Sequence, residues 1–369
     1  MRKGLTWFLT IVLLFTLSVP AMAEGESQCK IGETSYASLQ EAVNAVTTEA
    51  TIVLTADFEQ METVKITGGK EITLDLAGHT ITGTDTTTKN FGLIDNIKST
   101  LTVIDSVGNG TITLVATHDR DWDSYSAVLA NTQGTLTIKG GTFEHLGGTA
   151  MAYGVDSLTN GNIGDAILTI EGGTIRSTYR GIRQFANSTS KTNSLVITGG
   201  IISGTNKAVW LHASNANANI GTLEIKDDAT IEGDIYVYQF GKENAMNARN
   251  GSKISLQVEQ QCLEGEVICG LAENYALVNI NGVYGILGTP KVTLSDTGVA
   301  AEKVEGEAMI ILASYAEEKL LRIKAIPITG DGTYTFAAAG FVLDGADSIE
   351  AFLWDTMKPM CKPAVKSLG

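Results

Sequence analysis

The chain has 369 residues, a formal net charge of −15 and only 18% charged residues, with 40 glycines and 5 prolines. Such an acidic chain repels the phosphates of nucleic acids, so we expect no nucleic-acid partner. Frequent glycines, rare prolines and few charged residues argue against a disordered chain and favour an all-β protein.

Residues 1–23 have the pattern of a secretory signal peptide. Two basic residues precede the apolar run WFLTIVLLFTLSV, and the small-residue cleavage signal Ala21-Met22-Ala23 follows it. The run is short for a membrane span, which needs about 20 residues, and no later stretch is long and apolar enough. We therefore expect cleavage near Ala23, a secreted or cell-surface protein, and no transmembrane anchor.

A short helix is predicted at residues 38–47. Ser38 and Glu41 have the spacing of a capping box, in which the side chain of each residue accepts a hydrogen bond from the backbone N–H of the other. The apolar residues of this segment fall on one stripe: Leu39, Ala42, Val43 and Val46. Such a helix would cover the first strands of the following sheet, whose open end could otherwise pair with other chains.

A short strand motif then recurs every 27 to 35 residues. The aligned leucines are Leu74, Leu101, Leu136, Leu168, Leu195 and Leu223, and the second apolar positions are Leu76, Val103, Ile138, Ile170, Ile197 and Ile225. Alternation with polar residues indicates a strand with one buried face. A repeat this short buries that face only by stacking on its neighbours, which predicts a solenoid.

Glycine pairs and further strands complete each repeat. The pairs Gly140-Gly141, Gly172-Gly173 and Gly199-Gly200 allow sharp corners with positive φ. A second short strand follows each pair, and a third is predicted at residues 181–185, 208–212 and 235–239. No repeat has a helical periodicity. Three strands per rung predict a parallel β-helix over residues 24–286.

Beyond residue 287 the rung spacing ends. Alternating segments such as KVTLSDTG, AMIILASYA, KLLRIKAIPIT and SIEAFLWD are separated by turn residues. They predict a small β-sandwich over residues 287–369, joined to the β-helix near Ile286–Pro290 and folding as a separate unit.

Four cysteines and one acidic loop leave alternatives open. Cys29, Cys262, Cys269 and Cys361 allow three pairings, and only the Cys262–Cys269 spacing fits a small hairpin. In the loop HDRDWDSY, Asp119, Asp121 and Asp123 would share one side and could bind Ca²⁺. The EF-hand pattern is absent, so a solvated loop is the alternative; no cofactor is required.

The capping helix, the segment EITLDLAGHTITG and the LTIxGGT rungs resemble the right-handed parallel β-helix of the pectin-lyase-like superfamily, over roughly residues 35–285. The likeness is to secreted or surface proteins of bacteria, and residues 287–369 resemble an accessory module of secreted proteins of Gram-positive anaerobes. The resemblance implies a polysaccharide ligand or substrate. Lyases of the superfamily use clustered carboxylates for calcium and an arginine base, and its hydrolases use aspartates on adjacent rungs.

The matching catalytic elements are not found together. An Arg-Ile-Lys triplet occurs at Arg322–Lys324, but in the predicted sandwich, and Gly78-His79 fits a turn of the first rung. Acid–base cleavage of a glycosidic bond needs two facing carboxylates, and no convincing pair is apparent on the rungs. No catalytic residue is assigned.

The third strands carry the candidate binding residues. Counting from Leu168, Leu195 and Leu223, the fourteenth residues, Ile182, Val209 and Val237, would point inward. The fifteenth residues, Arg183, Trp210 and Tyr238, and the seventeenth, Phe185, His212 and Phe240, would then form two outward columns. Aromatic rings pack against sugar rings, and a guanidinium binds a carboxylate in a bidentate manner. The alternative is that a loop covers this strip and makes it ordinary packing.

Two functions fit these features. The first is a non-catalytic, adhesin-like β-helix, a monomer that binds a polysaccharide, a cell-surface glycan or matrix. The second is a carbohydrate-active enzyme, a polysaccharide lyase or glycoside hydrolase with a diverged site.

Overall fold

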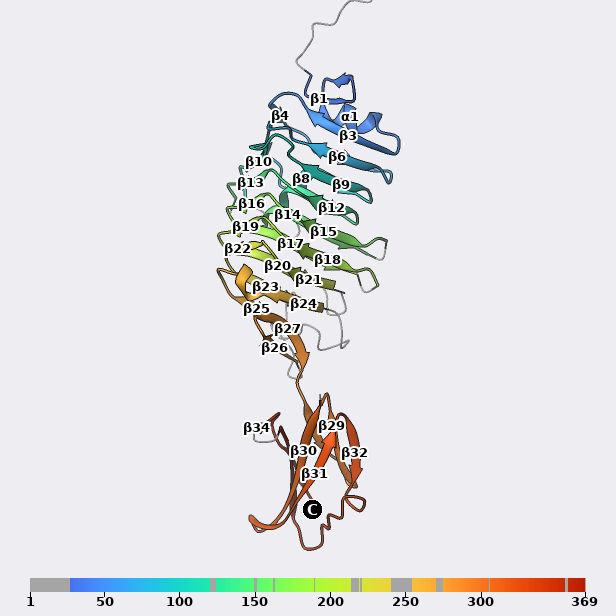
Figure 1. Ribbon diagram of the computed structural model, residues 1–369, viewed down its shortest axis with the longest axis vertical. Helices are drawn as coiled ribbons and strands as arrows, with labels where there is room; N and C mark the ends of the chain where they lie inside the picture. The colour runs from blue at the N-terminus through green and yellow to red at the C-terminus, as the bar shows by residue number, and fades with distance from the viewer. Residues whose placement is uncertain are drawn as a thin grey trace, which may run out of the picture.

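Parallel strands stacked in three sheets form most of the molecule (Figure 1). The computed structural model describes residues 27–119, 124–148, 151–161, 163–188, 190–213, 219, 221–239, 254–269, 275–304, 306–355 and 358–368. The predicted signal peptide lies outside these ranges. The chain is a parallel β-solenoid followed by separate antiparallel sheets, as the repeats and the C-terminal pattern predict.

Each turn of the solenoid adds one strand to each sheet, except that the last turn has a 3₁₀ turn, η1 (Gln260–Cys262), instead of a strand of sheet B. Sheet A contains the parallel strands β3 (Glu49–Leu54), β6 (Glu71–Asp75), β9 (Thr100–Ile104), β12 (Thr135–Ile138), β15 (Ala166–Ile170), β18 (Asn193–Ile197), β21 (Gly221–Ile225) and β24 (Ile254–Glu259). Sheet B contains β4 (Phe58–Gln60), β7 (Thr80–Asp85), β10 (Thr111–Ala116), β13 (Thr142–Leu146), β16 (Thr174–Ser177), β19 (Ile201–Gly204) and β22 (Thr230–Glu232). Sheet C contains β5 (Val64–Ile66), β8 (Phe91–Ile97), β11 (Ser126–Thr132), β14 (Ala152–Asn160), β17 (Arg180–Asn187), β20 (Lys207–Ala213), β23 (Ile235–Gln239) and β25 (Val267–Cys269).

Antiparallel hairpins close both ends of sheet A. One hairpin pairs β1 (Cys29–Ile31) with β2 (Thr34–Tyr36), and the other pairs β26 (Tyr275–Ile280) with β27 (Val283–Gly288). The 3₁₀ turn η1 precedes β25. The predicted helix is α1 (Leu39–Ala45), and the Ser38 hydroxyl accepts the Glu41 amide at its start. Its buried side chains join the solenoid core. The helix thus packs over the first strands, where an open stack would end.

The solenoid core is a ladder of inward side chains. Leu101, Leu136, Leu168, Leu195 and Leu223 occupy successive rungs of sheet A, as the repeat alignment predicts. Leu74 does not, because its partner is Val103, and Ile72 pairs with Leu101. The predicted alignment of the first repeat is therefore wrong by two residues, although Leu74 still points into the core.

Glycines form the corner between sheets A and B. Gly141, Gly173 and Gly200 have φ values of +90°, +86° and +84°. A β-carbon on Gly173 would lie 2.6 Å from the carbonyl oxygen of Gly141, and one on Gly200 would lie 2.6 Å from that of Gly173. Only glycine combines this backbone conformation with so close an approach between rungs.

The C-terminal part has two antiparallel sheets around one hydrophobic core. The first contains β28 (Lys291–Leu294), β29 (Gly298–Glu302) and β32 (Gly332–Thr335). The second contains β30 (Glu307–Ala316), β31 (Lys319–Thr329), β33 (Ser348–Asp355), β34 (Lys358–Pro359) and β35 (Ala364–Ser367). Their buried side chains form a cluster separate from that of the solenoid. The last strand of sheet A ends at Gly288, within the predicted junction.

Candidate functional site

The outer face of sheet C carries the residues that the third-strand count predicts. Residues of adjacent rungs that lie side by side form one outward column: Asp95, Ala130, Asp156, Arg183, Trp210 and Tyr236. Two residues further along each strand lies a second column: Ile97, Thr132, Leu158, Phe185, His212 and Tyr238. The residues preceding the first column, such as Ile182 and Val209, are in the solenoid core.

The two columns confirm part of the predicted arrangement and correct the rest. Arg183 lies beside Trp210, and Phe185 lies beside His212, as predicted. Tyr238 is in the second column, because Ile235 rather than Val237 pairs with Val209. Tyr236 therefore takes the predicted place of Tyr238, and Phe240 lies outside the described residues.

The strip is largely buried, as in the second of the two alternatives. Trp210 is 1% exposed, Arg183 is 6% exposed and His212 is 5% exposed, whereas Phe185 is half-buried. Trp210 belongs to a second apolar cluster outside the solenoid core, together with Ala127, Met151 and Tyr153, and with Tyr125 and Tyr236 packed against them. Tyr125 and Met151, which precede β11 and β14, pack into this cluster, so these side chains form an aromatic layer on the wall of the solenoid.

Arg183 and Asp156 form a buried ion pair within this layer. Nε of Arg183 donates to Oδ1 of Asp156 at 2.7 Å, and Nη2 donates to Oδ2 at 2.6 Å. The guanidinium carbon lies 4.5 Å from the ring centre of Tyr153 and 4.9 Å from that of Phe185. Burial by itself lowers the pKa of Arg183, but the Asp156 carboxylate outweighs it and raises the pKa above its usual range. The two side chains therefore satisfy each other's hydrogen bonds.

Arg180 is buried without a carboxylate. Its guanidinium carbon lies 3.6 Å from the Trp210 ring centre and 4.4 Å from that of Tyr179. It donates to the hydroxyls of Tyr153 at 3.3 Å and Tyr179 at 3.1 Å, and to Oδ1 of Asn206 at 3.2 Å. Within the described ranges it has no ion pair, although it is only 6% exposed. Among the residues that the structure describes, its positive charge is therefore stabilised by aromatic faces and hydroxyl groups rather than by a carboxylate.

His212 extends the aromatic stack as a neutral ring. Its ring centre lies 4.2 Å from that of Trp210 in a parallel arrangement, and 5.2 Å from that of Phe185 edge-on. Burial, together with the positive charges of Arg183 and Arg180, lowers the pKa of His212 to about 3. The imidazole is therefore uncharged at neutral pH and adds no charge to the site.

A half-buried rim borders the buried layer. Lys207 lies beside Arg180 on the next rung, and its Nζ is 4.0 Å from the ring centre of Tyr236. The same ammonium group forms an ion pair with Asp234 at 3.2 Å. Tyr179, Lys207 and Tyr236 are all partly accessible. The rim therefore lies between the buried layer and solvent.

Asp95 is a second carboxyl group on the first column, and sequence reasoning missed it. Burial, with a smaller effect from the Asp156 carboxylate, raises its pKa to about 6, despite a hydrogen bond from Thr132 at 3.0 Å. Ala130 separates it from Asp156, so the two aspartates are two rungs, about 9.6 Å, apart. Asp156 has both oxygens bound to Arg183 and is fully buried. Asp95 is therefore the accessible acid of the two.

The predicted calcium loop is described only in part. Asp119 is exposed, whereas Asp121 and Asp123 lie outside the described residues. Elsewhere in the described ranges, no group of three potential metal-binding side chains is found. The calcium site stays a prediction.

All four cysteines are free thiols, so the possible Cys262–Cys269 disulfide is not formed in this structure.

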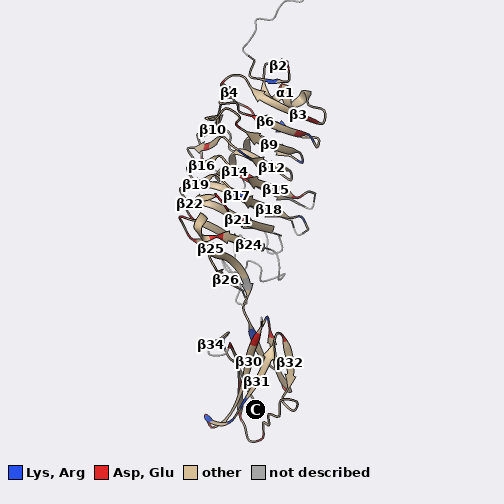
Figure 2. Ribbon diagram, in the orientation of Figure 1, with Lys and Arg blue, Asp and Glu red and all other residues tan. Residues whose placement is uncertain are grey.

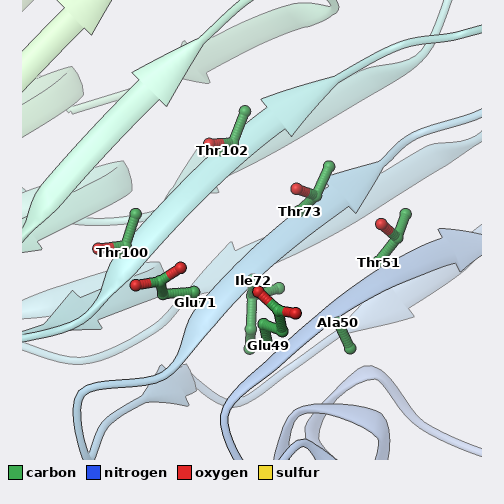
Figure 3. Close-up of a pocket in the computed structure, with 8 residues that line it drawn as sticks. All are labelled: Glu49, Ala50, Thr51, Glu71, Ile72, Thr73, Thr100 and Thr102. Carbon is green, nitrogen blue, oxygen red and sulfur yellow. The ribbon is translucent and has the colours of Figure 1, made fainter.

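A separate shallow groove of about 370 Å³ lies on the outer face of sheet A (Figure 3). Thr51, Thr73 and Thr102 follow one another across its rungs, with Glu49 and Glu71 side by side at one end. Two neighbouring carboxylates repel an anionic ligand. This groove therefore does not suit an acidic ligand. Acidic and basic residues otherwise occur along both parts of the chain (Figure 2).

No model of a known protein family matches the sequence, and no curated protein is similar enough to match it. The fold rests on the register of the strands, and the site on its own geometry. Among the described residues, no helix is long and apolar enough to cross a membrane.

Proposed function

We propose that this protein is a secreted or cell-surface β-solenoid that binds an anionic polysaccharide on the outer face of sheet C. One observation carries the proposal: Arg180 is a buried guanidinium with no carboxylate partner in the described part of the chain. A buried charge is costly unless it is paired. An acidic sugar bound at the rim, beside Tyr179 and Lys207, would bring a carboxylate close to Arg180 and offset its charge.

The rim provides the remaining contacts for a sugar chain. Tyr179 and Tyr236 offer partly accessible rings, on which the apolar faces of sugar rings pack. Lys207 lies between them as a second cation, one rung from Arg180. Trp210 is buried beneath and contacts both Arg180 and the cluster against which Tyr236 packs. Rungs spaced about 4.8 Å apart suit an extended, chain-like ligand.

The pectin-lyase-like superfamily is the proposed family, because the parallel solenoid, its cap helix and its glycine corners match the features of the resemblance. Right-handed winding and bacterial origin belong to the same proposal. Export rests on the signal-peptide pattern of residues 1–23, whose basic, apolar and small-residue regions occur in the required order.

The test uses rim variants, because the buried residues also support the fold. Tyr236→Ala and Lys207→Gln should each weaken binding to a polyuronate about tenfold, which corresponds to about 1.4 kcal/mol. Tyr36→Ala, a half-buried tyrosine of the first hairpin, is the matched control and should leave binding unchanged. Isothermal titration calorimetry measures the affinities. Equal affinities for all four proteins would refute the site.

Asp95 supports a second candidate function, cleavage of a polysaccharide. A carboxyl group with a pKa raised to about 6 is suited to donate a proton at neutral pH. Incubation with uronic-acid and neutral polysaccharides would reveal cleavage as new reducing ends or as unsaturated products that absorb ultraviolet light. Products from the natural protein, absent with Asp95→Asn, would establish the enzyme; no products would leave the binding function.

A further inference from the structure

The C-terminal part presents a long strand with one open edge. β31 is the outermost strand of its sheet and pairs only with β30. Seven consecutive residues, from Lys319 to Ala325, are exposed, among them Leu320 at 54% and Ile323 at 65%. Natural proteins avoid long exposed edges with apolar side chains, because such edges pair with other strands.

The backbone groups of this edge alternate in direction. The Gly330 amide donates to the Gly306 carbonyl at 3.1 Å, so even-numbered residues from Arg322 to Gly330 point their backbone groups toward β30, up to the register shift beside Ser314. Pro327, which has no N–H, occupies an odd position, as expected where the backbone faces solvent. The N–H and C=O groups of Ile323 and Ala325 therefore point outward and are available to an added strand.

The side chains alternate in chemistry as well. Ile323 and Ala325 lie beside Ala313 and Ile311, on the outer face of the sheet. On the opposite face, Arg322 lies beside Ser314 and Lys324 beside Leu312. Neither cation forms an ion pair with any residue that the structure describes; Arg322 donates to the carbonyl oxygens of Val342 and Asp344. One face of the edge is thus apolar and the other is basic.

From this geometry we infer that β31 binds an extended peptide segment in which apolar and acidic residues alternate. Such a strand places its apolar side chains beside Ile323 and Ala325 and its carboxylates beside Arg322 and Lys324, while its backbone completes the ladder. A second copy of β31 fits poorly, because antiparallel pairing would oppose the cations of both copies. This interaction is independent of glycan binding by the solenoid.

The experiment titrates full-length protein into a fluorescein-labelled decapeptide of alternating valine and glutamate, followed by fluorescence anisotropy. Two comparison peptides replace glutamate by lysine, or place the same residues in two blocks. The alternating acidic peptide should bind, and both comparison peptides should bind at least about tenfold more weakly, as expected when two favourable cross-strand charge pairs are lost. Absence of binding, or equal binding of all three peptides, overturns the inference.

Three variants test the mode of binding. Arg322→Glu combined with Lys324→Glu should reverse the preference toward the lysine peptide, whereas Lys362→Glu, an exposed lysine of the same part, should not. Ala325→Pro removes only an outward N–H, so it should abolish binding while the circular dichroism spectrum is kept. Retained binding by a folded Ala325→Pro variant, or dimers of the natural protein in light scattering, would overturn the inference.

Discussion

Replacing Arg183 by alanine leaves the carboxylate of Asp156 buried without its partner. The two side chains are 7% and 0% exposed, and two hydrogen bonds of 2.6 and 2.7 Å join them. Breaking a buried pair from one side typically costs about 3–5 kcal/mol, because the remaining charge stays desolvated. We expect a loss of unfolding free energy in this range for Arg183→Ala, and a similar loss for Asp156→Ala.

Guanidinium-induced unfolding, followed by tryptophan fluorescence, measures this loss. The combined variant Arg183→Leu/Asp156→Leu removes both charges and should cost clearly less than the two single changes added together. Lys139→Ala is the control, since its ion pair with Glu171 at 3.2 Å is 49% and 44% exposed and contributes at most about 1 kcal/mol. If Arg183→Ala and Asp156→Ala lose no more unfolding free energy than Lys139→Ala, the buried arrangement is refuted.

The remaining predictions concern register, pH and chain length. Leu168→Asp should lose several kcal/mol, because it buries a carboxylate in the core, while Thr169→Asp on the outer face should be mild; equal melting temperatures would contradict the register. In the folded protein the pKa of Asp95 is raised from 3.8 to about 6, so the native state keeps a proton that the unfolded chain has lost. The free energy of unfolding should therefore fall as the pH rises from about 4 to about 6. Asp95→Asn should remove the corresponding fall in melting temperature. If the variant and the natural protein show the same dependence of melting temperature on pH, the pKa of Asp95 is not raised. A chain shortened to end at Gly288 keeps β27 whole and should stay folded and β-rich by circular dichroism, whereas one ending at Gly285 cuts that strand and should melt earlier. Loss of folding in both would show that the solenoid depends on the C-terminal sheets.

Repetition and alternation in the sequence were sufficient to predict the strands, the corners and the inward side chains. They were not sufficient to fix the register in every rung. Leu74 and Tyr238 were both placed two residues away from their true partners. A slip of one residue exchanges the two faces of a strand, but a slip of two leaves the alternation intact. The pattern therefore cannot detect such an error.

The candidate site was harder to predict because it depends on the lengths of the turns and on which other side chains pack over the strip. Arg183 lies 15 residues after Leu168, but its partner Asp156 lies 20 residues after Leu136. A constant count therefore misses the aspartate, although aligning the strands of sheet C directly would have found it. The burial of the strip arises from residues such as Tyr125 and Met151, which lie in segments without a repeat pattern.

The proposed binding of an anionic sugar chain at Arg180 and the aromatic rim depends on the carboxylates of the sugar. Calorimetry at one fixed ionic strength compares two ligands of the same backbone, a polyuronate and its carboxyl-reduced counterpart, each titrated into the natural protein. The polyuronate should bind, and the reduced polymer should bind at least about tenfold more weakly, as expected for the loss of a charge-assisted contact. Equal binding of the two polymers, or no binding of either, would contradict the proposal.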